Sequence, residues 1–270
     1  MKIWSNTSTL KDYSEGLEFT VKKEEAEILL LGGKSVNLED FPNLRGIFRA
    51  GVGKDNVSET EATNRNIIVK YPSKETQKII FQETANFSTY LILKMLYKNI
   101  GELETWRKEK RIDLKQKKVL LLGQGNIGKL VKNNLAKLTT VLTFDIMFNP
   151  PYDLEKKLLQ ADCLSIHIPN SPENDSFIDA KKLSLLKDGS SIVNTARGPI
   201  VNEHDLLSEI KSQRLYAAFD VFWHEPYYGE LREFHPEQFY MTPHVASTCS
   251  GFLQGCRKDL DFLAQELSNE

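Results

Sequence analysis

The 270-residue sequence predicts an α/β fold with a doubly wound parallel sheet and a second, smaller α/β unit. Three observations favour this class. The apolar run Val119–Leu122 ends in a glycine turn, and apolar residues follow at helical spacing. Strand-like runs then alternate with helical segments as far as Asp220. The first part of the chain, to about Ile80, shows a similar alternation of short strands and polar connections.

Length and composition narrow the class of protein. At 30.9 kDa the chain is long enough for two domains, each with its own core. Its formal charge of −2 gives no electrostatic reason to expect nucleic acid or an anionic membrane as a partner. The three cysteines, Cys163, Cys249 and Cys256, lack metal-ligand spacing and predict reduced thiols in a cytoplasmic protein. We expect no metal site, and no apolar run approaches the roughly 18 residues of a membrane span.

The glycine turn has the spacing of a Rossmann-type dinucleotide site, Gly123-Gln124-Gly125-Asn126-Ile127-Gly128. Gly123 would permit the tight turn, Gly125 the approach of a pyrophosphate, and Gly128 close packing of helix on strand. The start of the following helix offers free N–H groups to phosphate oxygens. A plain strand–turn–helix connection can carry the same glycines, so the residues around the motif must decide.

The next apolar run, Val141–Phe144, is followed by Asp145. This acid favours a nucleotide-binding site over a plain strand–turn–helix connection. This position is close to the offset of about 20 residues expected for the acid that binds ribose hydroxyls. Asp145 also favours NAD over NADP. A phosphate about 4 Å from its carboxylate would be repelled by about 4 kcal/mol at a surface-like dielectric.

The front of the chain predicts a flavodoxin-like unit of short strands. Two glycine turns, residues 32–35 and 50–53, follow strands and are expected at the carboxyl edge of a parallel sheet, where such proteins bind ligands. A helical pattern from Gln82 to Lys110, broken near Gly101, would cross between the domains. The expected strands are Lys2–Trp4, Ala26–Leu31, Leu44–Arg49 and Ile67–Tyr71.

After Asp145 the pattern continues a parallel sheet. The run Asn149-Pro150-Pro151 first interrupts regular structure. Further along, Asn202 is a suitable N-cap for the predicted helix Glu203–Lys211. Strands are expected at Cys163–Ile168, Ser191–Asn194, Leu215–Asp220 and Phe239–Met241, and helices at Leu154–Leu159, Asp179–Leu186, Glu203–Lys211 and Gly251–Leu267.

Three side chains near strand ends could together perform a reaction. Arg197 can bind a carboxylate and polarise a ketone. Glu225 beside His244 would favour the protonated imidazole, which can then donate a proton. With hydride from NADH this set reduces a 2-oxo acid to a 2-hydroxy acid. Asp220 could bind the nicotinamide carboxamide, and His224 is an alternative proton donor that its neighbour Glu225 can hardly orient.

In these motifs the sequence resembles the D-isomer-specific 2-hydroxyacid dehydrogenases, which include phosphoglycerate dehydrogenase. The resemblance rests on the glycine motif with Asp145 and on the segments 161–169, 193–202, 220–226 and 242–244. At the front, residues 49–57 resemble the family's substrate-carboxylate loop. The resemblance covers roughly residues 40 to 265.

The resemblance implies an NAD-dependent dehydrogenase in which Arg197, Glu225 and His244 are catalytic. It also implies a homodimer formed through the NAD domain and an active site in a cleft between two domains. The substrate domain would span 1–90 with the C-terminal helix 248–270, and the Rossmann NAD domain 91–247. Cofactor contacts are expected at Gly123, Gly125, Asn126, Ile127, Gly128, Asp145, Pro169, Thr195, Ala196 and Asp220, and substrate contacts at Lys34, Arg49, Val52, Gly53 and Arg197.

The chain also departs from the family pattern. It is short, and the trimmed segment after Asp145 predicts loss of part of an edge strand and helix. Lys34-Ser35 stands where many relatives carry Arg-Ser, so the substrate stays open between phosphoglycerate, with Lys34 and Arg49 at its phosphate, and glyoxylate or hydroxypyruvate. A non-catalytic NAD(H)-sensing protein on the same scaffold is the alternative function.

Overall fold

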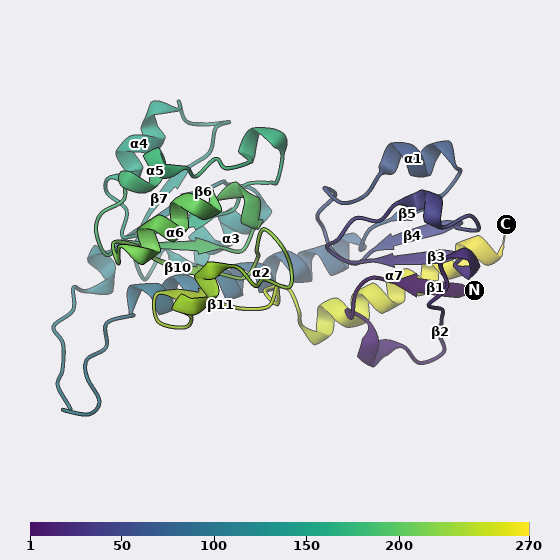
Figure 1. Cartoon of the computed structure of the whole chain (residues 1–270), viewed down its shortest axis with the longest axis horizontal. Helices are drawn as coiled ribbons and strands as arrows, with labels where there is room; N and C mark the ends of the chain where they lie inside the picture. Colours follow the sequence, from purple (N-terminus) through teal and green to yellow (C-terminus); the bar gives the residue numbers. More distant parts are fainter. Residues whose placement is uncertain (270) are drawn as a thin grey trace. The chain divides into compact units, whose positions relative to one another are not determined.

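The computed structural model describes residues 1–269, which divide into two compact units. The first unit comprises Met1–Ile80 and the chain from Ser247 onward, and the second comprises Phe81–Ala246. Each unit is built on one parallel sheet (Figure 1). The division after Ile80 lies inside helix α2 (Lys74–Leu96), ten residues before the boundary expected at residue 90. It lies there because Ala85 and Leu91 of this helix are already part of the second unit's core.

The sheet of the first unit has the strand order β2-β1-β3-β4-β5, which is the flavodoxin-like order. Strand β2 was not expected from the sequence, because it is short and exposed and has no apolar run. The strands are β1 (Lys2–Ser5), β2 (Glu18–Phe19), β3 (Ile28–Leu31), β4 (Gly46–Arg49) and β5 (Ile68–Lys70).

Both faces of this sheet are covered. Helix α7 (Ser250–Ser268) packs its apolar side on one face, where Phe252 and Leu260 contact a cluster that includes Ile28. Helix α1 (Glu59–Asn64) and the neighbouring loops cover the other face, through Ala62 and Phe41 (Figure 1). The C-terminal helix therefore completes the first unit, although the whole second unit separates the two parts in sequence.

The second unit is a six-stranded parallel sheet with the order β11-β10-β9-β8-β6-β7. Helices α4 (Tyr152–Leu158), α5 (Ala180–Ser184) and α6 (Glu203–Lys211) pack on one face, and α2 and α3 (Asn126–Leu135) on the other. This arrangement is the predicted doubly wound sheet. The strands are β6 (Lys118–Leu122), β7 (Thr140–Phe144), β8 (Cys163–Ile166), β9 (Ser191–Asn194), β10 (Tyr216–Phe219) and β11 (Phe239–Met241).

Strand β7 forms one edge of this sheet, since no strand follows it before α4. A complete doubly wound nucleotide fold places a third strand beyond this position. The residues between β7 and α4 leave three apolar side chains largely exposed, namely Ile146, Met147 and Phe148. The short segment after Asp145 thus leaves the first half of the sheet with two strands.

The long helix differs from its predicted range of Gln82–Lys110. It begins at Lys74, directly after Pro72 and Ser73, and the Ser73 hydroxyl accepts a hydrogen bond from the Thr76 N–H. It ends at Leu96, before the expected break at Gly101. The following residues form a long loop that projects from the second unit, with a single bridge between Glu102 and Arg107 (Figure 1).

Candidate active site

The second unit brings most of the predicted site residues to one edge of its sheet. All six strands are parallel, so the residues that follow them meet at the carboxyl edge. Gly123 follows β6, Asp145 follows β7, and Thr195 follows β9. Pro169, Asp220 and His244 likewise come just after β8, β10 and β11. This edge is where α/β proteins bind their ligands.

The three motif glycines meet different surroundings. Gly123 has φ +99°, and a Cβ there would lie 2.5 Å from the His167 carbonyl oxygen. A Cβ on Gly128 would lie 2.2 Å from the Gly123 carbonyl oxygen. Around Gly125 no atom lies within 4 Å of such a Cβ. Gly123 and Gly128 are therefore required by packing, whereas Gly125 borders open space.

This open space suits a cofactor pyrophosphate. Helix α3 begins just after Gly125, and its first N–H groups, including those of Asn126 and Ile127, have no acceptor within the helix. Free N–H groups and the positive end of the helix dipole favour an anion at this point. The residues present therefore fit a dinucleotide.

Asp145 links the glycine turn to the end of β7. Its Oδ2 accepts a hydrogen bond from the Gln124 N–H at 2.8 Å, and its Oδ1 accepts one from the Met147 N–H at 3.0 Å. The carboxylate is half-buried. Each carboxylate oxygen can accept more than one hydrogen bond, so Asp145 keeps acceptor capacity for ribose hydroxyls.

Glu225 and His244 form a close pair. Glu225 Oε2 lies 2.8 Å from His244 Nδ1, and Glu225 Oε1 accepts a hydrogen bond from the Phe222 N–H. Burial raises the pKa of Glu225, but the hydrogen bond and charge of His244, with the Phe222 N–H and the charge of Arg197, outweigh it and leave this pKa below 4.5. An ionised carboxylate can only accept, so Nδ1 carries the proton of this hydrogen bond. Nε2 is then the ring nitrogen that can exchange a proton.

His224, the alternative proton donor, is exposed. The Glu225 carboxylate is hydrogen-bonded to His244 across 19 residues of sequence. The geometry thus favours His244.

Asp220 holds the segment that carries His244. Its side chain is completely buried, and its Oδ1 accepts hydrogen bonds from the Thr242 hydroxyl at 2.6 Å and the Val245 N–H at 2.8 Å. Its Oδ2 accepts one from the Ala246 N–H at 2.9 Å. Burial raises the pKa of Asp220, and these three donors oppose that rise. Both oxygens thus bind the loop around His244, a role that sequence reasoning missed.

Arg197 belongs to a tight turn after β9. Asn194 is completely buried; its Oδ1 accepts a hydrogen bond from the Ala196 N–H, and its Nδ2 donates to the Arg197 carbonyl. Arg197 Nη1 in turn donates to the Ala196 carbonyl at 2.8 Å, and its charge contributes to the low pKa of Glu225. Asn194 therefore shapes the turn that presents Arg197. A buried Asn at a strand end was the available signal for this role.

His167 lies at the end of β8, next to the glycine turn. Its Nε2 is 2.9 Å from the Ser165 hydroxyl. Burial lowers the pKa of His167 to about 4, although part of the residue's surface stays accessible. The imidazole is therefore neutral at physiological pH.

The predicted substrate residues of the first unit lie on its two glycine turns. Arg49 is only 6% exposed; its Nε donates to Asn56 Oδ1, and its Nη1 to the Ala50 carbonyl. Asn56 Nδ2 donates to the carbonyls of Gly32 and Lys34. The side chain of Lys34 is exposed, and Val52 and Gly53 are half-buried.

Asn6 also joins these turns. Its Oδ1 accepts from the Gly32 N–H at 2.7 Å, and its Nδ2 donates to the Lys34 carbonyl at 2.9 Å. Arg49 thus helps to brace the loop that contains Val52 and Gly53, while Asn6 and Asn56 bind the two turns together. No sequence motif pointed to Asn6, because its partners come from other strand ends.

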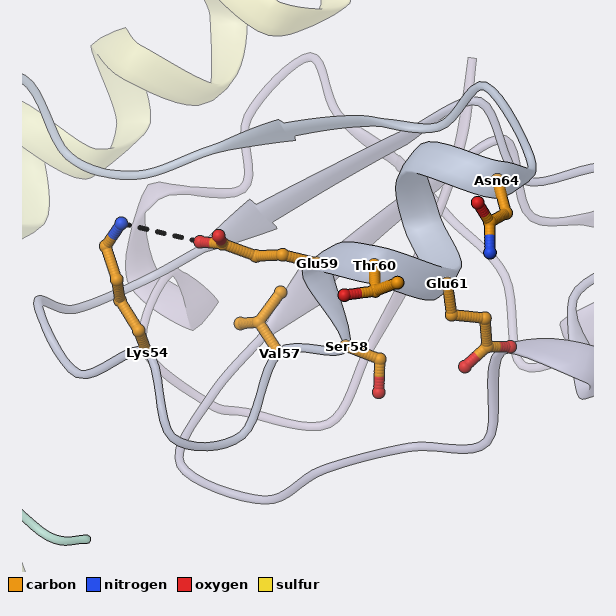
Figure 2. A pocket seen from close by; sticks show the side chains of 7 residues that line it. All are labelled: Lys54, Val57, Ser58, Glu59, Thr60, Glu61 and Asn64. Atoms are coloured by element: carbon orange, nitrogen blue, oxygen red, sulfur yellow. Dashed lines mark hydrogen bonds and ion pairs between the residues drawn. The ribbon is translucent and has the colours of Figure 1, made fainter.

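A pocket of about 640 Å³ lies over α1 in the first unit (Figure 2). Lys54 and Glu59, which both line it, form an ion pair with 3.4 Å between Lys54 Nζ and Glu59 Oε1. Glu59 also accepts a hydrogen bond from the Tyr71 hydroxyl. Glu61 also lines the pocket, so its lining carries one more acidic than basic side chain, and none of the residues predicted to contact substrate or cofactor is part of it. The lining residues are Lys54, Val57, Ser58, Glu59, Thr60, Glu61 and Asn64.

Residues 1–269 lack two further features. No group of three or more His, Cys, Asp or Glu side chains there could hold a metal ion. None of the helices in this range combines the length and the apolar character needed to cross a membrane.

Comparison with known proteins identifies the family. Residues 93–246 match the NAD binding domain of the D-isomer specific 2-hydroxyacid dehydrogenases. The chain belongs to this family. The predictions of an α/β Rossmann-type fold, of an NAD cofactor and of an NAD-dependent dehydrogenase of this family are therefore confirmed.

Two curated relatives and one solved structure illustrate the likeness. The hydroxypyruvate reductase of Thermotoga maritima is 30% identical over 228 residues, which are 78% of this chain and 73% of the relative. The D-3-phosphoglycerate dehydrogenase of Mycobacterium leprae is 30% identical over 226 residues, 77% of this chain but only 42% of the relative. The D-lactate dehydrogenase of Aquifex aeolicus, solved with NAD and lactic acid, is similar in fold, with a TM-score of 0.79 at 19% identity. That match covers 100% of this chain and 96% of the other.

Proposed function

We propose that the protein interconverts a 2-oxo acid and a 2-hydroxy acid, with His244 as the proton donor and acceptor. The observation that carries this proposal is the 2.8 Å contact between Glu225 and His244 at the carboxyl edge of the NAD-binding sheet. A carboxylate–imidazole pair is the usual means of supplying a proton near neutral pH. Family membership supports the general reaction.

Each of the three side chains has a distinct role in the proposal. Arg197 binds the substrate carboxylate through its guanidinium and helps to polarise the adjacent carbonyl. His244 gives the proton on Nε2 to the developing alkoxide oxygen, and the charge of Glu225 stabilises the imidazolium before the transfer. In the reverse direction the neutral imidazole removes the hydroxyl proton. NAD, when bound, supplies the hydride chemistry.

The cofactor would be held by the residues whose surroundings fit it. The pyrophosphate is assigned to Gly125 and the N-terminus of α3 at Asn126 and Ile127, with Gly123 and Gly128 shaping the turn. Asp145 is assigned to the ribose hydroxyls. The proposed set is completed by Pro169, Thr195, Ala196 and Asp220. Asp220 contributes by holding the loop around His244.

The proposed substrate is a small 2-oxo acid of the hydroxypyruvate or glyoxylate type, or a phosphorylated analogue. The names of the two curated relatives support both kinds. We assign the first unit to the substrate, through the backbone of Val52 and Gly53, with Arg49 bracing that loop. Lys34 remains the available cation for a phosphate, since its side chain is exposed.

We also propose a homodimer formed through the second unit, in the cytoplasm. The loop after α2 exposes large apolar side chains, among them Leu103 and Trp106. Residues 107–118 carry seven of the chain's 35 Lys and Arg residues and only two of its 37 Asp and Glu residues. The remainder of the chain is therefore acidic, and the charges of a second copy would be complementary to this loop.

The free thiols of Cys163, Cys249 and Cys256 agree with the proposed location in a reducing compartment, the cytoplasm.

The deciding experiment follows NADH oxidation with glyoxylate, hydroxypyruvate and phosphohydroxypyruvate. We expect turnover with at least one of them, and the ranking would name the substrate. Tight NADH binding without turnover on any of the three would overturn the enzymatic proposal. That result would instead support the alternative, a protein that senses NAD(H) on the same scaffold.

A further inference from the structure

Helix α2 contributes a hydroxyl group to the cofactor edge of the sheet. Ser88 Oγ lies 2.7 Å from Thr195 Oγ1, although the two residues are 107 positions apart in the sequence. Ser88 is completely buried, and Thr195 is 7% exposed. Ser88 Oγ is also 2.6 Å from the carbonyl oxygen of Thr84, one turn earlier in the helix.

These two contacts fix the direction of both protons. A carbonyl oxygen can only accept, so the Ser88 hydroxyl donates its proton to Thr84. Ser88 Oγ must then accept from Thr195, whose hydroxyl proton points into the protein. Thr195 Oγ1 is left with acceptor capacity only.

We propose that Ser88 is a positioning residue that fixes the Thr195 hydroxyl as an acceptor for a neutral hydrogen-bond donor of the nicotinamide nucleoside. This inference rests on the proposed cofactor contact of Thr195. The donors available there are the carboxamide NH2 group and the ribose hydroxyls. A phosphate or carboxylate oxygen offers no proton and would be rejected at this position.

Local structure gives no other reason for a serine at position 88. Alanine has the higher helix propensity, and a hydroxyl that bonds back to the preceding turn slightly destabilises a helix. Ser88 lies among apolar buried residues of α2, such as Ala85, Leu91 and Ile92, and one buried polar residue, Thr84, whose carbonyl oxygen accepts its proton. A buried hydroxyl costs free energy unless its hydrogen bonds are made, and within residues 1–269 the partner of Ser88 outside the helix is Thr195.

The test measures NADH affinity by fluorescence titration, without any substrate. We expect Ser88→Ala to weaken binding about tenfold, because the freed Thr195 hydroxyl can rotate and no longer presents its lone pairs. Thr195→Val should weaken it similarly, and the double variant should be no weaker than Thr195→Val. Thr195→Ser should retain most of the affinity.

Thr89→Ala is the matched control. Thr89 is the next residue of α2 and makes the same kind of bond to the carbonyl one turn earlier, at 2.7 Å, but its other contact is Asn134. Its removal should leave NADH affinity unchanged. A Ser88→Ala variant that binds NADH within twofold of the wild type would overturn the proposal, as would fully additive effects in the double variant.

An analogue with an acetyl group in place of the carboxamide separates the two donors. If wild type prefers NADH to this analogue and Ser88→Ala loses that preference, the carboxamide is the donor. If Ser88→Ala weakens both dinucleotides equally, a ribose hydroxyl is the donor. Because all these readouts are binding constants, they remain valid even if no 2-oxo acid is turned over.

Discussion

At the scale of single residues, proton positions follow from which atoms can only accept. The Glu225 carboxylate places a proton on Nδ1 of His244, and the Thr84 carbonyl places one on Ser88. Asp220, buried with three donors, keeps the His244 segment at the end of β10. In the proposed reaction, proton transfer at this edge would thus depend on groups that do not themselves meet the substrate.

Substitution of His244 and Arg197 should separate proton transfer from substrate binding. We expect His244→Ala to lower kcat by about 10²- to 10⁴-fold with NADH affinity nearly unchanged, since general acid catalysis is lost. Arg197→Ala should raise KM for the oxo acid and lower kcat as well. Steady-state kinetics with direct NADH titration would measure both effects. Near-normal turnover of His244→Ala would show that another group donates the proton, and His224→Ala is the control expected to stay active.

His167 should make the protein less stable in weak acid. Its pKa in the folded protein, about 4, lies below the ordinary 6.5, because burial disfavours the charged ring. As pH falls below 6.5 the unfolded chain binds this proton first, so stability declines between pH 6.5 and 4 and then levels off with respect to this group. The loss should be of the order of 3 kcal/mol.

Urea unfolding at pH 7, 6 and 5 would measure this decline. A His167→Asn variant, which has no titratable ring, should show a shallower dependence over the same range. Parallel curves for the two proteins would show that His167 does not titrate as described.

At the scale of elements, the turn between β6 and α3 combines two kinds of glycine. Gly128 is held by packing, since any Cβ would meet the Gly123 carbonyl, whereas Gly125 faces open space. The same residue type therefore serves the fold at one position and, in the proposed function, the cofactor at the other. Helix α2 likewise serves both units, because it passes from one core into the other.

Alanine substitutions should separate these two roles. Gly128→Ala should lower the free energy of unfolding by about 1 to 3 kcal/mol, because backbone must shift to admit the methyl group. Gly125→Ala should leave thermal stability within a degree or two but weaken NADH binding at least tenfold, since its methyl occupies the space proposed for the pyrophosphate. Thermal unfolding and NADH titration of both variants give the answer. If the Gly125→Ala protein bound NADH normally, the pyrophosphate would not bind at this turn.

At the scale of the whole molecule, the proposed dimer would explain why the loop after α2 exposes large apolar side chains. Trp106 is 77% exposed within one chain, and exposed aromatic side chains of this size commonly mark an interface. Trp106→Glu should convert the dimer to monomer in analytical ultracentrifugation at micromolar concentration. Tyr228→Glu is the matched control, since Tyr228 is 76% exposed and lies in the same unit but outside that loop. A wild-type protein that sediments as a monomer would refute the dimer itself.

Much of this architecture was predictable from local patterns. The apolar runs of β9 and β11 and the helix after Asn202 have the predicted bounds, and Asn202 caps that helix as expected. Asp145 could be proposed as the acid that binds the ribose hydroxyls because it follows an apolar strand at a characteristic distance from the glycines. The predicted extent of α2 was wrong. Its apolar residues are shared between two cores, and its start depends on the hydrogen bond of the Ser73 hydroxyl.

The sequence by itself determined the fold class, the NAD cofactor and the family, because these depend on short-range periodicity and on motifs of fixed spacing. Only the tertiary structure decided which side chains act together. Glu225 meets His244, Asp220 meets Val245, and Ser88 meets Thr195 because parallel strands and a packed helix bring distant segments to one edge. Hydrogen bonds of this kind depend on distances of about 3 Å between atoms far apart in the chain, and no local pattern encodes those distances.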